Sequence, residues 1–514
     1  MRLILLSQNQ TKMRKIGILL LFFVVLLSSN PILAQRGKGV AKNKVKGHKI
    51  AIKIDGAKDS IIYLAIHYRE RLMLRDSARN DGRSAFLFKG DEPYQEGLYT
   101  LVSQDRKPYL NFIIDGPQEF TYFIDTLGDV RNFNVKNSPQ NEEMLRFQRK
   151  TVYAQMKVKE YQEKIKEFQE TNEDSLEFYN QKVRDINAEM EQFITELIDK
   201  NPTYLFSKLQ KSYRQIEIPD PPVRADGTID SNYQAVYYRT HYWDNFDLTD
   251  DRFIYLPSLE RAMSEYFNQI LWLHEPDTIN HYVDMVIQKT EGDSVMYRYF
   301  VERLSYIFET SKIIGHDAVF VHIANENQLK GKCYWIEEEL LGRYERRVKG
   351  LEPTLIGKIA PEIIMPDTSF TTDFNQWHSS YNMKKPYVIL WFYDPACHTC
   401  KTESEHLRTV YDSLEAIGQR NFDVYAVGSD PDKERLKKYV KEKNYPWLNV
   451  GGNSANIDYI AAYNIIGNPT MYIFDNRTRK IILNKRIEMS AIPIFLEQHE
   501  KIEKHKQELM EKNR

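Results

Sequence analysis

The chain has 514 residues, and its 71 Lys and Arg nearly balance its 72 Asp and Glu, which gives no electrostatic basis for binding nucleic acid. Hydrophobic residues make up 42% of the chain and aromatic residues 12%, and this composition argues against wholesale disorder. Three cysteines are too few for a disulfide framework, so at most one bridge is expected.

The N-terminus has the pattern of an export signal. It combines basic residues, an apolar run and a small-residue cleavage site: Lys12, Arg14 and Lys15, then Ile16–Leu27, then Ala34. We predict that residues 1–34 are a cleaved signal peptide, followed by a basic leader at 35–46, and that the mature protein is periplasmic. The alternative is an uncleaved membrane anchor formed by residues 16–33.

Residues 47–135 have the pattern of a small antiparallel β domain. Apolar residues alternate with others at Ile50, Ile52 and Ile54, and turn sequences separate the short runs that follow. These runs are Ile61–Tyr68, Ala85–Phe88, Tyr99–Val102, Tyr109–Ile114 and Glu119–Ile124. Many short strands with turn punctuation predict a β-sandwich-like domain. No residue in it points to catalysis, so we expect it to bind or to pack.

Residues 136–350 form a predicted helical domain. Its first part has apolar residues at spacings of three and four, in two series: Val158, Tyr161, Ile165 and Phe168, then Leu176, Tyr179, Val183, Ile186, Met190, Phe193 and Leu197. The two series predict a helical hairpin or a short coiled coil. We favour packing within one chain over dimerisation, because each series is shorter than the heptad repeats of a stable coiled coil.

Two features of the helical domain allow alternative interpretations. Tyr233–Asp251 is dense in aromatic residues, which we assign to the core in preference to a carbohydrate or peptide site. Cys333 stands alone beside Tyr334 and Trp335. We interpret it as a buried structural thiol, and the alternative is a third redox cysteine.

Residues 351–514 alternate between strand and helix patterns, which is typical of an α/β domain with a partly parallel sheet. The predicted strands are Glu362–Met365, Tyr387–Tyr393, Phe422–Val427, Leu448–Val450, Met471–Phe474 and Lys480–Arg486. The predicted helices are His406–Gly418, Pro431–Lys443, Ile457–Tyr463 and Ser490–Lys512. The whole chain is therefore expected to be an α+β multidomain protein.

A cysteine pair follows the most apolar of these strands. After Tyr393 the chain turns at Asp394–Pro395 and reads Cys397-His398-Thr399-Cys400. Residues three apart lie on one face of a helix, so the two thiols can close a small ring. A cysteine at a helix N-terminus has its thiolate stabilised by the free N–H groups there, and a protonated His398 would lower the pKa of Cys397 further. The pattern predicts thiol–disulfide exchange.

The alternative for this motif is half of a zinc site. A closed zinc site needs four ligands, and neither a second Cys-x-x-Cys nor a nearby third cysteine is present. We therefore expect no metal and no cofactor.

The segment Ile389–Cys400 resembles the active-site segment of the thioredoxin superfamily. Lys358–Pro361 and Cys400–Glu403 resemble its peroxiredoxin-like and TlpA/ResA-like branch, and the resemblance covers about residues 354–500. The preceding regions resemble, more faintly, uncharacterised domains that precede such modules in exported proteins of some Gram-negative bacteria.

The resemblance implies roles for individual residues. Cys397 is the attacking thiol, Cys400 resolves the mixed disulfide, and the two form a Cys397–Cys400 disulfide in the oxidised protein. Pro469, after Asn468, resembles the cis-proline of the family, so both residues are expected beside the thiols as substrate-binding residues, together with His398. Glu403 matches an acidic position and is the candidate proton shuttle.

The chain also departs from the family pattern. Trp391 stands where thioredoxins have a buried acid, so the proton of Cys400 must be accepted elsewhere. Glu405 replaces an expected proline, which puts a helix kink in doubt. The proline and threonine that precede a peroxidatic cysteine are absent, because Leu390 stands seven residues and Asp394 three residues before Cys397. A peroxidase is therefore disfavoured.

These observations predict an exported thiol–disulfide oxidoreductase, and the branch resemblance favours a reductase. Its partners would be protein thiols and disulfides, with a membrane electron donor that recharges it, and no nucleic acid. The alternative is a non-enzymatic periplasmic binding or scaffold protein that retains a thioredoxin fold. The sequence leaves the substrate and the oligomeric state open.

Overall fold

The computed structural model describes residues 47–126, 128–168, 172–224, 226–368, 376–452 and 454–512. The predicted signal peptide at 1–34, the basic leader at 35–46 and the alternative anchor at 16–33 lie outside the described residues. The described chain forms two compact units. The first comprises the residues up to Tyr213 and Arg252–Arg261, and the second comprises Arg214–Asp251 and the residues from Ala262 onward. The predicted helical domain at 136–350 thus contributes to both units.

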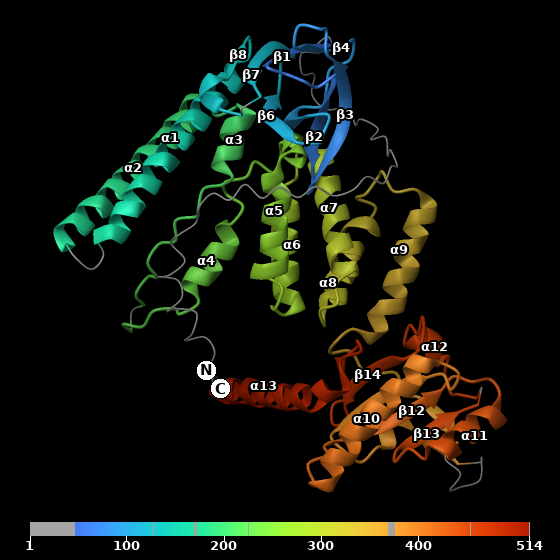
Figure 1. Cartoon of the computed structure of the whole chain (residues 1–514). Coiled ribbons are helices and arrows are strands. Elements are labelled where there is room, and N and C mark those ends of the chain that lie inside the picture. Colours follow the sequence, from blue (N-terminus) through green and yellow to red (C-terminus); the bar gives the residue numbers. More distant parts are fainter. Residues whose placement is uncertain are drawn as a thin grey trace. The chain divides into compact units, whose positions relative to one another are not determined.

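The first unit contains two four-stranded sheets (Figure 1). The strands are β1 (His48–Asp55), β2 (Ile61–Tyr68), β3 (Arg71–Arg79), β4 (Ala85–Gly90), β5 (Gly97–Val102), β6 (Pro108–Ile114), β7 (Glu119–Asp125) and β8 (Asn134–Lys136). The strand orders are β4-β1-β7-β8 and β3-β2-β5-β6, and neighbours are antiparallel except for the parallel pair β1 and β7. Ile50, Ile52 and Ile54 are fully buried in one core with residues of both sheets, as their alternation predicts.

Strand β3 is absent from the predicted set, and its exposure explains why. Leu72, Met73 and Leu74 are 45%, 45% and 55% exposed, so the strand has no alternation between a buried and an exposed face. It forms by pairing along its whole length with the buried strand β2, after a turn in which Arg69 has a φ of 56°. Pairing with a neighbour therefore defines this strand more than its own pattern does.

A helical hairpin follows the sheets in the first unit. It consists of α1 (Pro139–Phe168) and α2 (Glu173–Lys200), which lie side by side in Figure 1, and α3 (Leu205–Lys211) follows. Phe168 stacks on Tyr179 with ring centroids 6.0 Å apart, and Tyr161 contacts the same ring. The predicted seam is thus used within one chain.

The second unit begins with more helices: α4 (Tyr233–His241), α6 (Pro276–Gln288), α7 (Ser294–Glu309), α8 (His316–Ile323) and α9 (Glu338–Leu351). Helix α5 (Pro257–Glu265) spans the boundary between the units and continues as a π-helical turn, Tyr266–Ile270. Tyr242 and Trp243 are buried, which supports a core role for this part of the aromatic stretch. Cys333 precedes α9 and is 5% exposed, and burial raises the pKa of its thiol to about 12. These features fit a structural thiol.

The C-terminal part of the second unit is built on a five-stranded sheet of order β13-β12-β11-β14-β15. The elements are β9 (Ile364–Pro366), β10 (Trp377–Ser379), β11 (Tyr387–Tyr393), α10 (His398–Ala416), β12 (Phe422–Gly428), α11 (Lys433–Lys443), β13 (Leu448–Gly451), α12 (Tyr459–Ala462), β14 (Thr470–Asp475), β15 (Ile481–Leu483) and α13 (Ile492–Lys512). Strands β11, β12 and β13 are parallel, whereas β14 is antiparallel to both β11 and β15. The predicted α/β arrangement with a partly parallel sheet is confirmed.

The central strand β11 is apolar throughout because both of its faces are covered. Ile389 and Trp391 enter a core with residues of α10, α11 and α13. Leu390 and Phe392 enter a second core on the opposite face, with residues of β9 and the region of α12. All seven residues of β11 are buried, so the strand is a rigid base for the segment that follows it.

Candidate active site

Cys397 caps the N-terminus of α10, immediately after β11. Asp394 shapes the connecting turn, because its Oδ1 accepts a hydrogen bond from the N–H of Ala396 at 2.7 Å. The Sγ of Cys397 then accepts a hydrogen bond from the N–H of Cys400 at 3.3 Å. Sulfur thus occupies the position that a serine or aspartate oxygen usually takes at a helix start. The predicted location of Cys397 at the beginning of the helix is confirmed.

The two thiols have opposite environments. Cys397 is partly exposed, and the pKa of its thiol is lowered by a hydrogen bond from the Cys400 thiol and by the N–H groups of Cys400 and Thr399. Cys400 is fully buried, and this burial raises its pKa to about 12. Both cysteines are free thiols in this structure. The outer sulfur is therefore the better nucleophile at neutral pH, and the inner sulfur remains protonated.

The loop that precedes β14 lies against the outer thiol. The peptide bond between Asn468 and Pro469 is cis, as expected, and the Cys397 thiol lies 3.9 Å from the carbonyl oxygen of Asn468. The Nδ2 of Asn468 donates to the Oγ of Ser429 at 2.8 Å, and that hydroxyl donates to the carbonyl oxygen of Tyr393. Asn468 and Pro469 are thus held beside the cysteine pair through the ends of β11 and β12.

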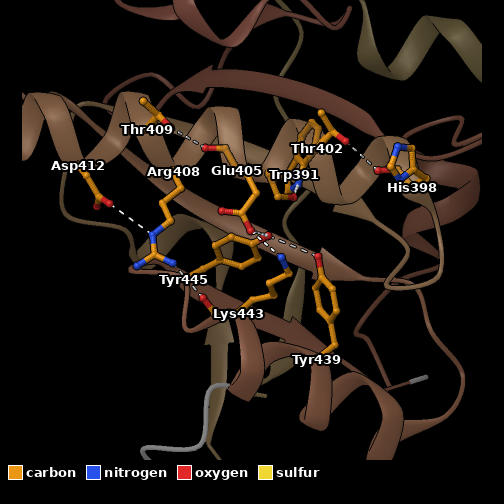
Figure 2. Close-up of polar contacts among 11 residues, drawn as sticks. Trp391, His398, Thr402, Glu405, Arg408, Thr409, Asp412, Tyr439, Lys443 and Tyr445 are labelled. Atoms are coloured by element: carbon orange, nitrogen blue, oxygen red, sulfur yellow. Dashed lines mark hydrogen bonds and ion pairs between the residues drawn. The ribbon is translucent and has the colours of Figure 1, made fainter.

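Trp391 occupies the position where the family resemblance places a buried acid, and its indole forms a structural hydrogen bond instead. The indole Nε1 of Trp391, labelled in Figure 2, donates to the Oγ of Ser404 at 2.9 Å. Both side chains are buried. This bond ties β11 to α10 one turn after Cys400. The pairing could not be read from the sequence, because it joins positions 13 residues apart through the fold.

The side chains of Glu403 and His398, the other predicted site residues, form none of the hydrogen bonds found at the two sulfurs. The carboxylate of Glu403 lies 3.9 Å from the Nδ1 of His406. The side chain of His398 is exposed, and its carbonyl oxygen accepts a hydrogen bond from Thr402 (Figure 2). The roles of Glu403 and His398 therefore stay predictions.

Glu405 forms a polar link between α10 and the end of α11. Its Oε1 accepts from the Nζ of Lys443 at 2.7 Å and from the hydroxyl of Tyr445 at 3.3 Å (Figure 2). The lysine, followed by the tyrosine, lowers the pKa of the carboxyl group. Helix α10 runs without interruption through this position. The carboxylate thus stabilises helix packing where the family pattern has a proline.

Metal-binding clusters and membrane-spanning helices are both absent from the described residues. In the described ranges, no three His, Cys, Asp or Glu side chains are grouped so that they could hold a metal ion. Within the same ranges, no helix is both long and apolar enough to cross a bilayer.

Replacing Cys400 by Ala should raise the pKa of Cys397, because the change removes the thiol hydrogen bond that contributes most to lowering it. A hydrogen bond that stabilises the charged form of a group lowers the pKa of an acid, so we expect the midpoint to move to higher pH when this bond is lost. The measurement is the pH dependence of Cys397 alkylation by iodoacetamide, followed by peptide mass spectrometry. Cys333→Ala is the control and should leave the midpoint unchanged. A midpoint that stays in place or falls in the Cys400 variant would contradict the geometry.

Replacing Trp391 by Phe should destabilise the C-terminal domain, because Ser404 would be left buried without its donor. The expected loss in the free energy of unfolding is about 1–3 kcal/mol, measured by urea denaturation and circular dichroism. Trp377→Phe is the matched control, since Trp377 is 53% exposed and should tolerate the change. Equal stabilities of the two variants would show that the indole bond contributes nothing.

Two family models match the chain. The AhpC/TSA family matches residues 356–482, and a domain of unknown function, DUF5106, matches residues 182–347. The second match agrees with the predicted uncharacterised domain ahead of the redox module. No curated protein matches the chain.

Solved structures from several bacteria also resemble parts of the chain. A thioredoxin-like protein from Bacteroides caccae is 20% identical over 55% of this chain and 100% of its own, with a TM-score of 0.42. A domain of a possible thiol-disulfide isomerase from Cytophaga hutchinsonii is 30% identical over 29% of this chain and 97% of its own, with a TM-score of 0.26. The thioredoxin domain of a thiol-disulfide oxidoreductase from Bacteroides vulgatus is 24% identical over 28% of this chain and 96% of its own, with a TM-score of 0.24. The C-terminal part of this chain is thus similar to the AhpC/TSA family over residues 356–482.

Proposed function

We propose that the chain is an exported thiol–disulfide oxidoreductase that reduces disulfides in protein substrates. The observation that carries the proposal is the asymmetry of the two thiols. Cys397 is accessible and has a lowered pKa, whereas Cys400 is buried with a pKa of about 12. A pair that exchanges disulfides needs one ready nucleophile and one protected thiol that acts second.

The reaction proceeds in two exchange steps. The Cys397 thiolate attacks one sulfur of the substrate disulfide, so a mixed disulfide forms and the second substrate sulfur leaves as a thiolate. The Cys400 sulfur then attacks the Sγ of Cys397, which forms the Cys397–Cys400 disulfide and releases the first substrate sulfur. Two electrons pass to the substrate, and the proton lost by Cys400 balances the charge of a departing thiolate. Glu403 is the proposed shuttle for that proton.

The cis-proline loop is the proposed docking element for the substrate. The carbonyl group of Asn468 lies beside the Cys397 sulfur, and Pro469 has no N–H group to donate. An extended substrate segment can therefore align with this loop while its disulfide meets Cys397. His398, exposed at the first turn of α10, is proposed to contact the same segment.

Export and the reductive direction belong to the proposal and rest on the sequence. The signal-like pattern of residues 1–34 supports export, and the TlpA/ResA-like resemblance supports reduction. An exported reductase works in an oxidising compartment, so it needs a membrane electron donor to regenerate its dithiol.

Two other functions are disfavoured by the residues at the site. A peroxidase lacks support because Leu390 and Asp394 stand where the peroxidatic pattern has proline and threonine, respectively. A non-enzymatic scaffold would have no need for two intact cysteines with opposite environments.

Insulin reduction tests the proposal. The wild-type protein should accelerate the reduction of insulin by dithiothreitol, and Cys397→Ser should return the rate to that of dithiothreitol alone, because the nucleophile is lost. Cys333→Ala is the matched control and should retain the wild-type rate, since that thiol is buried and burial raises its pKa. Equal rates for wild type and Cys397→Ser would refute the proposal.

A further inference from the structure

A cavity of about 370 Å³ lies beside the cis-proline loop, within the second unit. Pro469 and Thr470 form part of one wall. The other walls come from the helical region and from the segment that follows β15, with Glu309, Asp317 and Arg347 from α7, α8 and α9 and Asn484–Arg486 after the strand. The proposed substrate loop therefore faces a space that the thioredoxin-like domain does not build alone.

Hydrogen bonds hold the walls of this cavity together. The Nδ2 of Asn484 donates to the Oδ2 of Asp317 at 2.6 Å. The Nζ of Lys485 donates to the carbonyl oxygens of Ser311 and Ile313 at 2.9 and 2.7 Å. These bonds connect the segment after β15 to the chain between α7 and α8. The cavity is therefore a fixed part of the unit, shaped before any ligand arrives.

The charged side chains of the cavity differ in how far they are paired. The Oδ2 of Asp317 accepts from Asn484, whereas its Oδ1 is buried and has no hydrogen-bond partner among the described residues. The Nε of Arg347 lies 3.3 Å from the Oε1 of Glu309, and Lys485 is bonded as described above. Arg486 is exposed, and across the described ranges it has neither a hydrogen bond nor an ion pair. The lining as a whole has three cationic and two acidic side chains. The cationic side chains thus exceed the acidic ones by one, and Arg486 is the cation that is exposed and open to an anionic ligand.

The loop that lines the cavity also contacts the reacting sulfur. The Cys397 thiol meets the carbonyl of Asn468, and the next two residues, Pro469 and Thr470, line the cavity. Ile466, which also lines it, is 81% exposed and offers apolar surface. A polypeptide that brings a disulfide to Cys397 along this loop places neighbouring residues at the cavity.

We infer that this cavity binds the substrate segment next to the reactive disulfide and that Arg486 selects an acidic side chain in that segment. The inference rests on the proposed function, because it assigns a substrate class to the same site. It gives the helical region a task in catalysis, since α7, α8 and α9 complete the binding site that the cis-proline loop begins.

The test uses synthetic peptides with one internal disulfide, identical except for a Glu, a Gln or a Lys beside one cysteine. The full-length protein is assayed for kcat/KM with each peptide. An exposed ion pair contributes little, so the Glu peptide should exceed the Gln peptide by about two- to fivefold, and the Lys peptide should be the poorest. Arg486→Gln should bring the Glu to Gln ratio close to one, whereas Arg486→Lys should keep most of the preference.

Lys506→Gln is the matched control, because it also removes one positive charge but does not line the cavity. It should keep the wild-type ratio. A wild-type ratio near one, or an unchanged ratio in Arg486→Gln, would overturn the inference. Failure of the wild-type protein to reduce any of the three peptides would instead overturn the proposed function, so the two failures are distinguishable.

Discussion

The hydrogen bond from the N–H of Cys400 to the Sγ of Cys397 is the interaction on which the site depends. It makes the outer sulfur the cap of α10 and so gives that sulfur a set of donors that favour its thiolate form. The same helical turn carries Cys400 into the core, where burial keeps the second thiol protonated. One local geometry thus produces both the nucleophile and its protected partner.

The rest of the domain keeps this geometry in place. Strand β11 is buried on both faces, and the bond between Trp391 and Ser404 fixes α10 against it. Glu405 joins the same helix to Lys443 on its other flank. A tryptophan in the place of a buried acid therefore removes a possible proton acceptor for Cys400, but its hydrogen bond to Ser404 helps to hold α10 against β11. The proton of Cys400 has no carboxylate at this position to receive it.

The sequence predicts what depends on local pattern. The alternation of Ile50, Ile52 and Ile54 correctly predicts a strand, and the Asp394–Pro395 turn before Cys397 correctly predicts a helix start. Strand Arg71–Arg79 escapes prediction because its neighbour creates it and its side chains are mostly exposed. The cavity could not be predicted for a similar reason. Asn484 and Asp317 are 167 residues apart in the sequence, and only the folded chain brings them together.

The most direct measurement is the trapping of a mixed disulfide with the Cys400→Ser variant. Without the resolving thiol, the first exchange step should stop after the attack, so mass spectrometry should find a disulfide-containing protein substrate attached covalently to Cys397. Cys397→Ser should trap none. A conjugate at Cys333, or no conjugate with either variant, would contradict the assignment of Cys397 as the attacking thiol.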